Sequence, residues 1–215
     1  MNNITLTSID TKYKNATLKV LKEQSKLFDF NKVVFFTNGV EDGSIIIENI
    51  PDIVGKKEGY SYSYFCLREL PKRIDTEFCL VVQHDGFIIN PHLWSDEFLE
   101  YDYIGAPWPY NYFNKVGNGG FSLRSKKFLD VCDSIFENVN IDEHEDLLAC
   151  VIYYDEMKKR GIKFAPPELA ARFALEHWTE YHLLNGQTFP TFGFHGDSTQ
   201  IGKNILNENN NSLSL

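Results

Sequence analysis

The sequence predicts an α/β domain whose central sheet is mainly parallel and flanked by helices. Strand and helix patterns follow one another in the order β-α-β-β-α-β over the first 85 residues, and the last of these strands is a continuous apolar run. The chain has 215 residues, 43% of them hydrophobic, which is enough for one sizeable core. Because no linker or internal repeat divides it, we expect a single domain over residues 1–202 and a polar, disordered tail over 203–215.

Periodicity identifies the elements of the first half. Alternating apolar and polar residues are typical of a strand, and Leu18, Leu21 and Leu27 share one stripe of a helix. The run EFCLVVQ is the most continuous buried strand in the chain. The expected elements are, in order, a strand at 4–9, a helix at 15–28, strands at 32–37 and 44–47, a helix at 60–70 and a strand at 77–83.

The second half is less regular, because glycine, proline and aromatic residues interrupt its apolar patterns. We expect, in order, an aromatic proline-rich loop at 105–112, a glycine turn at 117–120, helices at about 142–159 and 167–177, and a short passage through 192–196.

Charge and composition exclude several classes of protein. Lysine and arginine number 21 against 30 acidic residues, and the net charge of −9 argues against a protein that tracks nucleic-acid phosphates. No apolar run approaches the roughly 20 residues that span a bilayer, so no transmembrane segment is expected. No secretory signal is visible. The four cysteines lie apart in apolar runs without a Cys-x-x-Cys pair, as expected of reduced thiols in a cytoplasmic protein.

The strand at 77–83 runs into the tetrapeptide Gln83-His84-Asp85-Gly86. Ligands of open α/β sheets bind at the carboxyl ends of strands. A carboxylate there suits Mg²⁺ or Mn²⁺ that is also held by substrate phosphates. An Asp-Gly turn in which Asp85 bonds its own backbone explains the same residues, and on this tetrapeptide alone the turn is the better interpretation.

The glycine cluster Gly117–Gly120, followed by Phe-Ser-Leu-Arg-Ser, is a second candidate. Three glycines in four positions allow the backbone to approach a ligand closely. The spacing does not fit a dinucleotide-binding fingerprint. A loop that only connects two elements is an equally good interpretation.

Acidic and histidine side chains supply two further candidates. The acids at 142–146 open a predicted helix, where the helix dipole alone explains most of them. One of these carboxylates would act as a general base if it projected into a cleft. His195, between Phe194 and Gly196, is either a structural residue or a neutral metal ligand.

The segment 103–112, YIGAPWPYNY, concentrates the aromatic rings of Trp108, Tyr110 and Tyr112. Such rings form a stacking platform for a sugar, or they pack the loop onto the core. The sequence leaves both interpretations open.

The order of these segments resembles that of the GT-A-fold glycosyltransferases. More closely, it resembles a family of glycosyltransferase-like domains found in bacterial and large-virus proteins. The motifs that carry the resemblance are Q-x-D-G at Gln83–Gly86, Y-I-G-A-P-W at Tyr103–Trp108 and the specific G-N-G-G-F-S-L-R-S at Gly117–Ser125. The resemblance continues through Glu145-Asp146 and Arg172-Phe173 to Phe192–Gly196, and it implies a single GT-A-like, Rossmann-like nucleotide-diphospho-sugar transferase domain.

The resemblance also implies a metal site and a base. Asp85 matches the last Asp of an Asp-x-Asp motif, whereas Gln83 replaces the first, and His195 matches a C-terminal metal-binding histidine. Asp85 and His195 would therefore hold Mn²⁺ or Mg²⁺. In the x-Glu-Asp motif Asp146 would be the general base, with Glu145 as its substitute, which favours an inverting reaction.

Donor and acceptor contacts follow from the same resemblance. The acceptor would lie against Trp108 and Tyr110. Asp10 would face the nucleotide base, while Arg124 and Arg172 either contact the diphosphate or, as we favour, form structural ion pairs. The residues expected to contact the donor are Thr7, Ser8, Asp10, Gln83, His84, Asp85, Gly119 and Gly120.

The predicted activity is transfer of a sugar, in a hexosyltransferase-type reaction, from a UDP-glucose-like donor to a hydroxyl of a glycan or another acceptor. A non-catalytic nucleotide-sugar or carbohydrate-binding module on the same fold is the alternative. A nucleotidyltransferase would need glycines after the first strand, where the chain has Asp-Thr-Lys-Tyr at 10–13. A metal-dependent hydrolase would need more ligands than Asp85 and His195.

Overall fold

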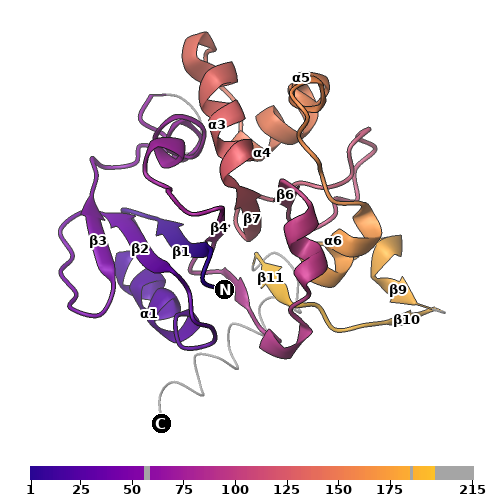
Figure 1. Ribbon diagram of the computed structural model, residues 1–215, viewed down its shortest axis with the longest axis horizontal. Coiled ribbons are helices and arrows are strands. Elements are labelled where there is room, and N and C mark those ends of the chain that lie inside the picture. The colour runs from indigo at the N-terminus through magenta and orange to yellow at the C-terminus, as the bar shows by residue number, and fades with distance from the viewer. Residues whose placement is uncertain (56–58, 185, 197–215) are drawn as a thin grey trace.

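The computed structural model describes residues 1–55, 59–184 and 186–196, and a six-stranded sheet organises them (Figure 1). The strands lie in the order β3-β2-β1-β4-β7-β6. The first four run parallel, whereas β7 pairs antiparallel with β4 and β6, so the sheet is mostly but not purely parallel. The strands are β1 (Ile4–Ile9), β2 (Lys32–Thr37), β3 (Ile46–Asn49), β4 (Phe78–Val81), β6 (Tyr103–Ile104) and β7 (Ser122–Ser125).

Two helical connections cover the parallel strands. Helix α1 (Lys14–Gln24) joins β1 to β2, and a continuous helical segment, α2 (Tyr62–Tyr64), η1 (Phe65–Glu69) and η2 (Leu70–Lys72), joins β3 to β4. Right-handed connections that cross the sheet in opposite directions lie on opposite faces. Figure 1 shows α1 below the strands and the other segment above them. The central strands β1 and β4 are therefore covered on both sides, which explains their apolar runs.

Helix α3 (Lys126–Ile135) was not expected from the sequence. Ser125 caps it by accepting a hydrogen bond from the Phe128 backbone N–H at 3.0 Å, and Phe128, Leu129 and Cys132 face the core. These buried residues recur at helical spacing, so the sequence does carry the pattern of this helix. A 3₁₀ turn, η5 (Phe136–Asn138), ends the helix.

The predicted helix at 142–159 begins three residues later and is interrupted. Helix α4 (Glu145–Leu147) starts after His144, whose backbone is extended, and continues as the π-helical η6 (Leu148–Ile152). A break at Tyr153 separates these from α5 (Tyr154–Lys159). The next helix, α6 (Pro167–Phe173), begins at the predicted proline and ends four residues earlier than expected.

A smaller three-stranded sheet brings the end of the described chain back to β4. Strand β11 (Gly193–His195) pairs antiparallel with β5 (Gly86–Ile88) and parallel with β8 (Ala174–Leu175), in a register that sets His195 opposite Gly86. Short 3₁₀ turns and a hairpin complete the structure: η3 (Pro91–Leu93), η4 (Asp96–Glu100), η7 (Glu180–His182), β9 (Leu183–Leu184) and β10 (Gln187–Thr188).

The kind and order of the first-half elements are confirmed, with β1 and β2 at the predicted bounds and β3 shifted by two residues. Helix α1 ends four residues before the predicted 28, so Leu27 lies outside it. The predicted domain boundary at 202 and the tail at 203–215 lie outside the described residues. All four cysteines are buried and free. Within the described part of the chain, no helix is long and apolar enough to cross a membrane.

Candidate functional site

A tight hairpin turn at the end of β4 presents His84 and Asp85. The Gln83 N–H donates to the Gly86 carbonyl at 2.7 Å, and the Gly86 N–H returns a bond to the Gln83 carbonyl at 3.2 Å. The two residues between them therefore project at the carboxyl edge of the parallel strands. The tetrapeptide therefore forms the expected turn, and this turn lies at the strand end where a ligand site was expected.

The hairpin places Asp85 against His195, although 110 positions separate them in the sequence. The Gly196 N–H donates to the Asp85 carbonyl at 2.8 Å, which ties the end of β11 to the turn. His195 Nε2 lies 3.9 Å from Asp85 Oδ1 and 3.2 Å from Gln83 Oε1. Asp85 Oδ1 is buried and accepts no hydrogen bond from any residue that the structure describes. A buried carboxylate oxygen without a hydrogen bond is costly unless another group satisfies it.

Glu176 lies on the other side of the His195 ring. Its Oε1 is 3.2 Å from His195 Nδ1, and its Oε2 is 4.0 Å from His177 Nε2. Burial lowers the pKa of His195, but the hydrogen bond and charge of Glu176, with the charges of Asp85 and Asp146, raise it overall. Burial raises the pKa of Glu176, but the hydrogen bond from His195, the charges of His195 and His177 and a hydrogen bond from Asn118 together outweigh burial and lower it. Glu176 is therefore a carboxylate that orients the ring.

The glycine loop packs directly against these side chains. A Cβ on Gly120 would lie 2.0 Å from His195 Nε2, and a Cβ on Gly86 would lie 2.7 Å from the same ring. A Cβ on Gly119 would lie 1.7 Å from Glu145 Oε1. Of the loop residues, only Asn118 has a positive φ, 65°. The glycines are thus needed for close approach rather than for an unusual backbone conformation.

Asp146 joins the site through the same loop. The Gly119 N–H donates to Asp146 Oδ2 at 3.0 Å, and the Leu147 N–H donates to Asp146 Oδ1 at 2.8 Å. Since Gly120 touches His195, two consecutive loop residues contact the expected base and the expected metal ligand. Asp146 is partly exposed, and its charge acts on His195.

Glu145 is placed differently. Its side chain is 6% exposed and pairs with Arg124, whose Nη2 lies 3.2 Å from Glu145 Oε1. Burial, followed by the charge of Asp146, raises the pKa of Glu145. A carboxylate held inside the protein by a buried arginine cannot reach an acceptor in this conformation, so the structure does not support Glu145 as a substitute base.

The loop that follows β1 lies beside the β4–β5 turn and forms one side of the site. Thr7 and Ser8 have no exposed surface, and Thr7 Oγ1 donates to the Val34 carbonyl, so neither side chain can contact a donor directly in this conformation. Asp10 accepts hydrogen bonds from the Lys12 and Tyr13 backbone N–H groups and from the Thr17 hydroxyl. Its carboxylate builds the loop instead of facing outward.

His84 links this loop to the hairpin. Its ring stacks on Tyr13 with centroids 4.4 Å apart, and its Nδ1 lies 4.0 Å from Asp10 Oδ2. Tyr13, 47% exposed, therefore supplies the flat surface at this edge. No sequence pattern pointed to Tyr13.

The aromatic loop divides into a buried and an exposed part. Trp108 is 5% exposed and packs over Gly117, where a Cβ would lie 2.0 Å from its ring. Tyr110 is 48% exposed and lies 6.2 Å, ring to ring, from His177. Of the two expected acceptor residues, only Tyr110 presents a ring on the surface.

Both arginines are in ion pairs. Arg124 is buried with Glu145, and Arg172 bonds Glu97 at 2.8 Å. Each arginine therefore already has an acidic partner within the protein, as expected of the structural role favoured from the sequence.

Three groups near the site were missed from the sequence: Tyr13, Asn118 and Glu176. Glu176 follows β8 and reaches His195 only because β8 and β11 are neighbours. The spacing of residues in the sequence cannot predict a contact that depends on the pairing of distant strands. Asn118 carried a signal, since asparagine adopts positive φ inside a turn more readily than most residues other than glycine.

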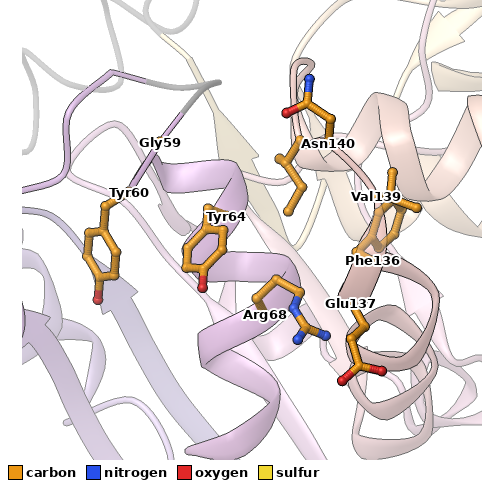
Figure 2. Close-up of a pocket in the computed structure, with 9 residues that line it drawn as sticks. Gly59, Tyr60, Tyr64, Arg68, Phe136, Glu137, Val139 and Asn140 are labelled. Atoms are coloured by element: carbon orange, nitrogen blue, oxygen red, sulfur yellow. The ribbon is translucent and has the colours of Figure 1, made fainter.

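A separate cavity of about 400 Å³ lies between the helical segment after β3 and the end of α3 (Figure 2). Arg68 on its wall pairs with Asp133 at 2.6 Å. None of the residues expected to bind donor, acceptor or metal lines this cavity. Its lining residues are Gly59, Tyr60, Tyr64, Arg68, Phe136, Glu137, Val139, Asn140 and Ile141.

Comparison with known proteins gives one family and a fold. A family profile described as "Protein of unknown function (DUF5672)" matches residues 45–195, a range that includes Asp85, Asp146 and His195. No curated protein matches the chain. A solved glycosyltransferase involved in the glycosylation of the major capsid of PBCV-1 is similar at 13% identity and a TM-score of 0.52, over 95% of this chain and 98% of that one. At this identity the similarity shows a shared fold.

Two further solved structures are more distant. The bifunctional IspDF from Campylobacter jejuni has 12% identity and a TM-score of 0.47, over 76% of this chain and 48% of that one. The mannosyltransferase PcManGT from Pyrobaculum calidifontis, in complex with GDP-Man and Mn²⁺, has 10% identity and a TM-score of 0.47, over 77% and 55%. The chain thus spans about half the length of these two proteins.

Proposed function

The chain belongs to the DUF5672 family, and we propose that it is a cation-dependent glycosyltransferase that moves a sugar from a nucleotide-diphosphate donor to an acceptor hydroxyl. The observation that carries the proposal is the convergence of Asp85, His195, Gly119–Gly120 and Asp146 at one edge of the sheet. The fold shared with a solved glycosyltransferase supports it.

The residues present fit a divalent cation. The described residues contain no cluster of three or more His, Cys, Asp or Glu side chains arranged for a metal. Two ligand atoms that are each about 2.1 Å from one ion lie at most about 4.2 Å apart. The 3.9 Å between Asp85 Oδ1 and His195 Nε2 falls within that limit, and a cation would satisfy the buried Asp85 oxygen. Mg²⁺ or Mn²⁺ suits a site with few protein ligands, because phosphates and water complete its shell.

When bound, the cation would neutralise negative charge that develops on the leaving diphosphate. His195 would donate its Nδ1 proton to Glu176, and its Nε2, which lies 3.2 Å from Gln83 Oε1 and 3.9 Å from Asp85 Oδ1, would face the cation. The Gly120 and Gly86 contacts hold the plane of this ring.

Asp146 is the proposed general base. It would accept the proton of the acceptor hydroxyl while the hydroxyl oxygen bonds to the anomeric carbon and the bond to the diphosphate oxygen breaks. The nucleoside diphosphate leaves with the bonding electrons. A single displacement of this kind inverts the anomeric configuration.

Surfaces beside these groups would hold the rest of the substrates. Tyr13 and His84 would contact the nucleoside, and we propose a UDP-sugar as donor. Tyr110 and His177 would flank the acceptor, a glycan or another hydroxyl compound. Gly119, too crowded to carry a side chain, would let the loop approach the transferred sugar.

Gln83 in place of a second carboxylate is the observation that favours the other candidate, a module that binds nucleotide sugars without transferring them. Such a module would bind UDP with a cation and release no sugar. The two functions therefore differ in turnover rather than in binding.

The Asp146→Asn variant tests the proposed activity. Asparagine keeps an oxygen that can accept the Gly119 N–H but cannot take a proton, so we expect turnover to fall roughly 100-fold or more with donor affinity nearly unchanged. Nucleotide release from a UDP-sugar panel measures turnover, and calorimetry measures donor binding. Arg172→Gln, which removes an exposed ion pair with Glu97, is the matched control. Equal turnover in wild type and Asp146→Asn would refute the base, and UDP-sugar binding without any turnover in wild type would favour the binding module.

A further inference from the structure

Arg124 and Glu145 form a buried ion pair that the mechanism above leaves without a task. Their side chains are 1% and 6% exposed. Arg124 Nη2 bonds Glu145 Oε1 at 3.2 Å and the Gly119 carbonyl at 3.1 Å, and Arg124 Nε bonds the Ser122 hydroxyl at 3.0 Å. Two of these bonds reach the glycine loop or the residue next to Asp146, and the third reaches Ser122, whose own hydroxyl donates to the Gly119 carbonyl.

The pair completes a clamp on one peptide unit, Gly119. Its carbonyl accepts from Arg124 and from the Ser122 hydroxyl, the latter at 3.2 Å. Its N–H donates to Asp146 at 3.0 Å. Its Cα packs against the Glu145 carboxylate so closely that no side chain fits between them. Since Glu145 and Asp146 are consecutive, fixing one side chain constrains the other.

We propose that Arg124 and Glu145 are positioning residues, which hold Gly119 and α4 together so that the Asp146 carboxylate keeps the orientation needed for proton transfer. The proposal rests on the function proposed above for Asp146. Neither residue touches a substrate. Both act through Gly119 and the backbone of α4.

Stability alone does not account for such a pair. Removing two ions from water is expensive, and replacing a buried pair by apolar residues of similar volume is often neutral or stabilising. The directional bonds to Gly119 are what apolar residues would lose. A misplacement of about 1 Å at a reacting group costs on the order of 100-fold in rate.

The double variant Arg124→Met/Glu145→Leu separates the two roles, because it removes the clamp without leaving a lone buried charge. We expect a melting temperature close to that of wild type, a kcat roughly 10- to 100-fold lower with the donor KM changed less than about threefold, and amide exchange at Gly119 at least about tenfold faster. Met157→Leu, a volume-conserving change of a fully buried residue on α5, is the control and should match wild type in all three.

Wild-type kcat together with wild-type exchange at Gly119 in the double variant would overturn the proposal. If the double variant does not fold, Arg124→Lys takes its place, since it keeps the charge but its single nitrogen cannot replace both the Nη2 bonds to Glu145 and Gly119 and the Nε bond to Ser122. It should give an intermediate kcat, and a wild-type kcat would overturn the proposal. If wild type itself transfers no sugar, the proposed function fails. Amide exchange at Gly119 in the double variant then tests the clamp independently of activity, and an exchange rate equal to that of wild type refutes the clamp.

Discussion

The glycines of this site matter mainly because they have no side chain, which lets neighbouring side chains pack against the backbone. Gly119 and Gly120 have no unusual φ, yet side chains on either would overlap Glu145 or His195. Asn118, the residue with positive φ, turns the loop and accepts the Gly120 N–H at 3.0 Å. The sequence indicated that backbone would approach something closely at this loop. It did not indicate that the nearest partners would be the protein's own acids and histidine.

Asp85 is the residue at which the cation proposal can be tested by substitution. In Asp85→Ala we expect Mn²⁺-dependent donor binding to weaken at least about tenfold, because one of two protein ligands is lost. Binding measured in EDTA should be unchanged from wild type. Calorimetry with UDP, with and without Mn²⁺, makes the comparison. Equal weakening in both conditions would mean that Asp85 supports the fold or the nucleotide rather than a cation.

At the scale of elements, the site depends on strand pairings between distant parts of the chain. The β4–β5 hairpin was readable from Gln83–Gly86, because a turn and a strand end have local signatures. Strand β11 was not readable, since its three residues acquire their place only by pairing with β5 and β8. Glu176 was missed for the same reason. The sequence therefore named both Asp85 and His195 as candidate ligands, but only the strand pairing brings the two side chains together.

Strand β11 should be sensitive to one added methyl group. A Cβ on Gly193 would lie 2.1 Å from the Phe121 ring in the core, so in Gly193→Ala either the ring or the strand must move. We expect the free energy of unfolding to fall by about 1–3 kcal/mol. Mn²⁺ affinity should fall as well, because His195 is on the same strand.

Chemical denaturation and Mn²⁺ titration would measure these two effects. Gly43→Ala is the matched control, because the residue is exposed and the added methyl group would have no atom within 4 Å. Its stability and Mn²⁺ affinity should stay near those of wild type. Gly193→Ala with wild-type stability would show that the Phe121 contact relaxes at no cost.

At the scale of the whole molecule, the sequence predicted the class of fold but not its details. Apolar strands joined by helical connections required a parallel core, which β1 to β4 form. The antiparallel strands β6 and β7 are four residues or fewer, too short to show a period of two. Because β7 pairs with β4, the glycine loop that precedes β7 lies next to the hairpin turn that follows β4.

The buried pair should make global stability depend on pH. The folded state raises the pKa of Glu145, so it binds this proton more tightly than the unfolded chain does. The resulting stabilisation is fully present below the unfolded value of about 4.5 and is lost as the pH rises through the raised pKa. Between pH 4.5 and 8, wild type should therefore lose on the order of 1–3 kcal/mol more than Glu145→Gln, which cannot titrate.

Denaturant unfolding of both proteins at a series of pH values measures this difference. The other titrating groups contribute almost equally to the two curves and cancel on subtraction. Parallel curves, with no divergence above pH 4.5, would show that Glu145 is ionised in the folded protein throughout this range.

The central claim is that one cation-bridged donor site unites the β4–β5 turn with the end of β11. Anomalous diffraction from crystals grown with Mn²⁺ and UDP tests it most directly. We predict a manganese peak between Asp85 Oδ1 and His195 Nε2, in contact with the diphosphate of the bound UDP. A manganese ion bound elsewhere, or UDP bound with Asp85 and His195 left in contact with each other, would contradict it.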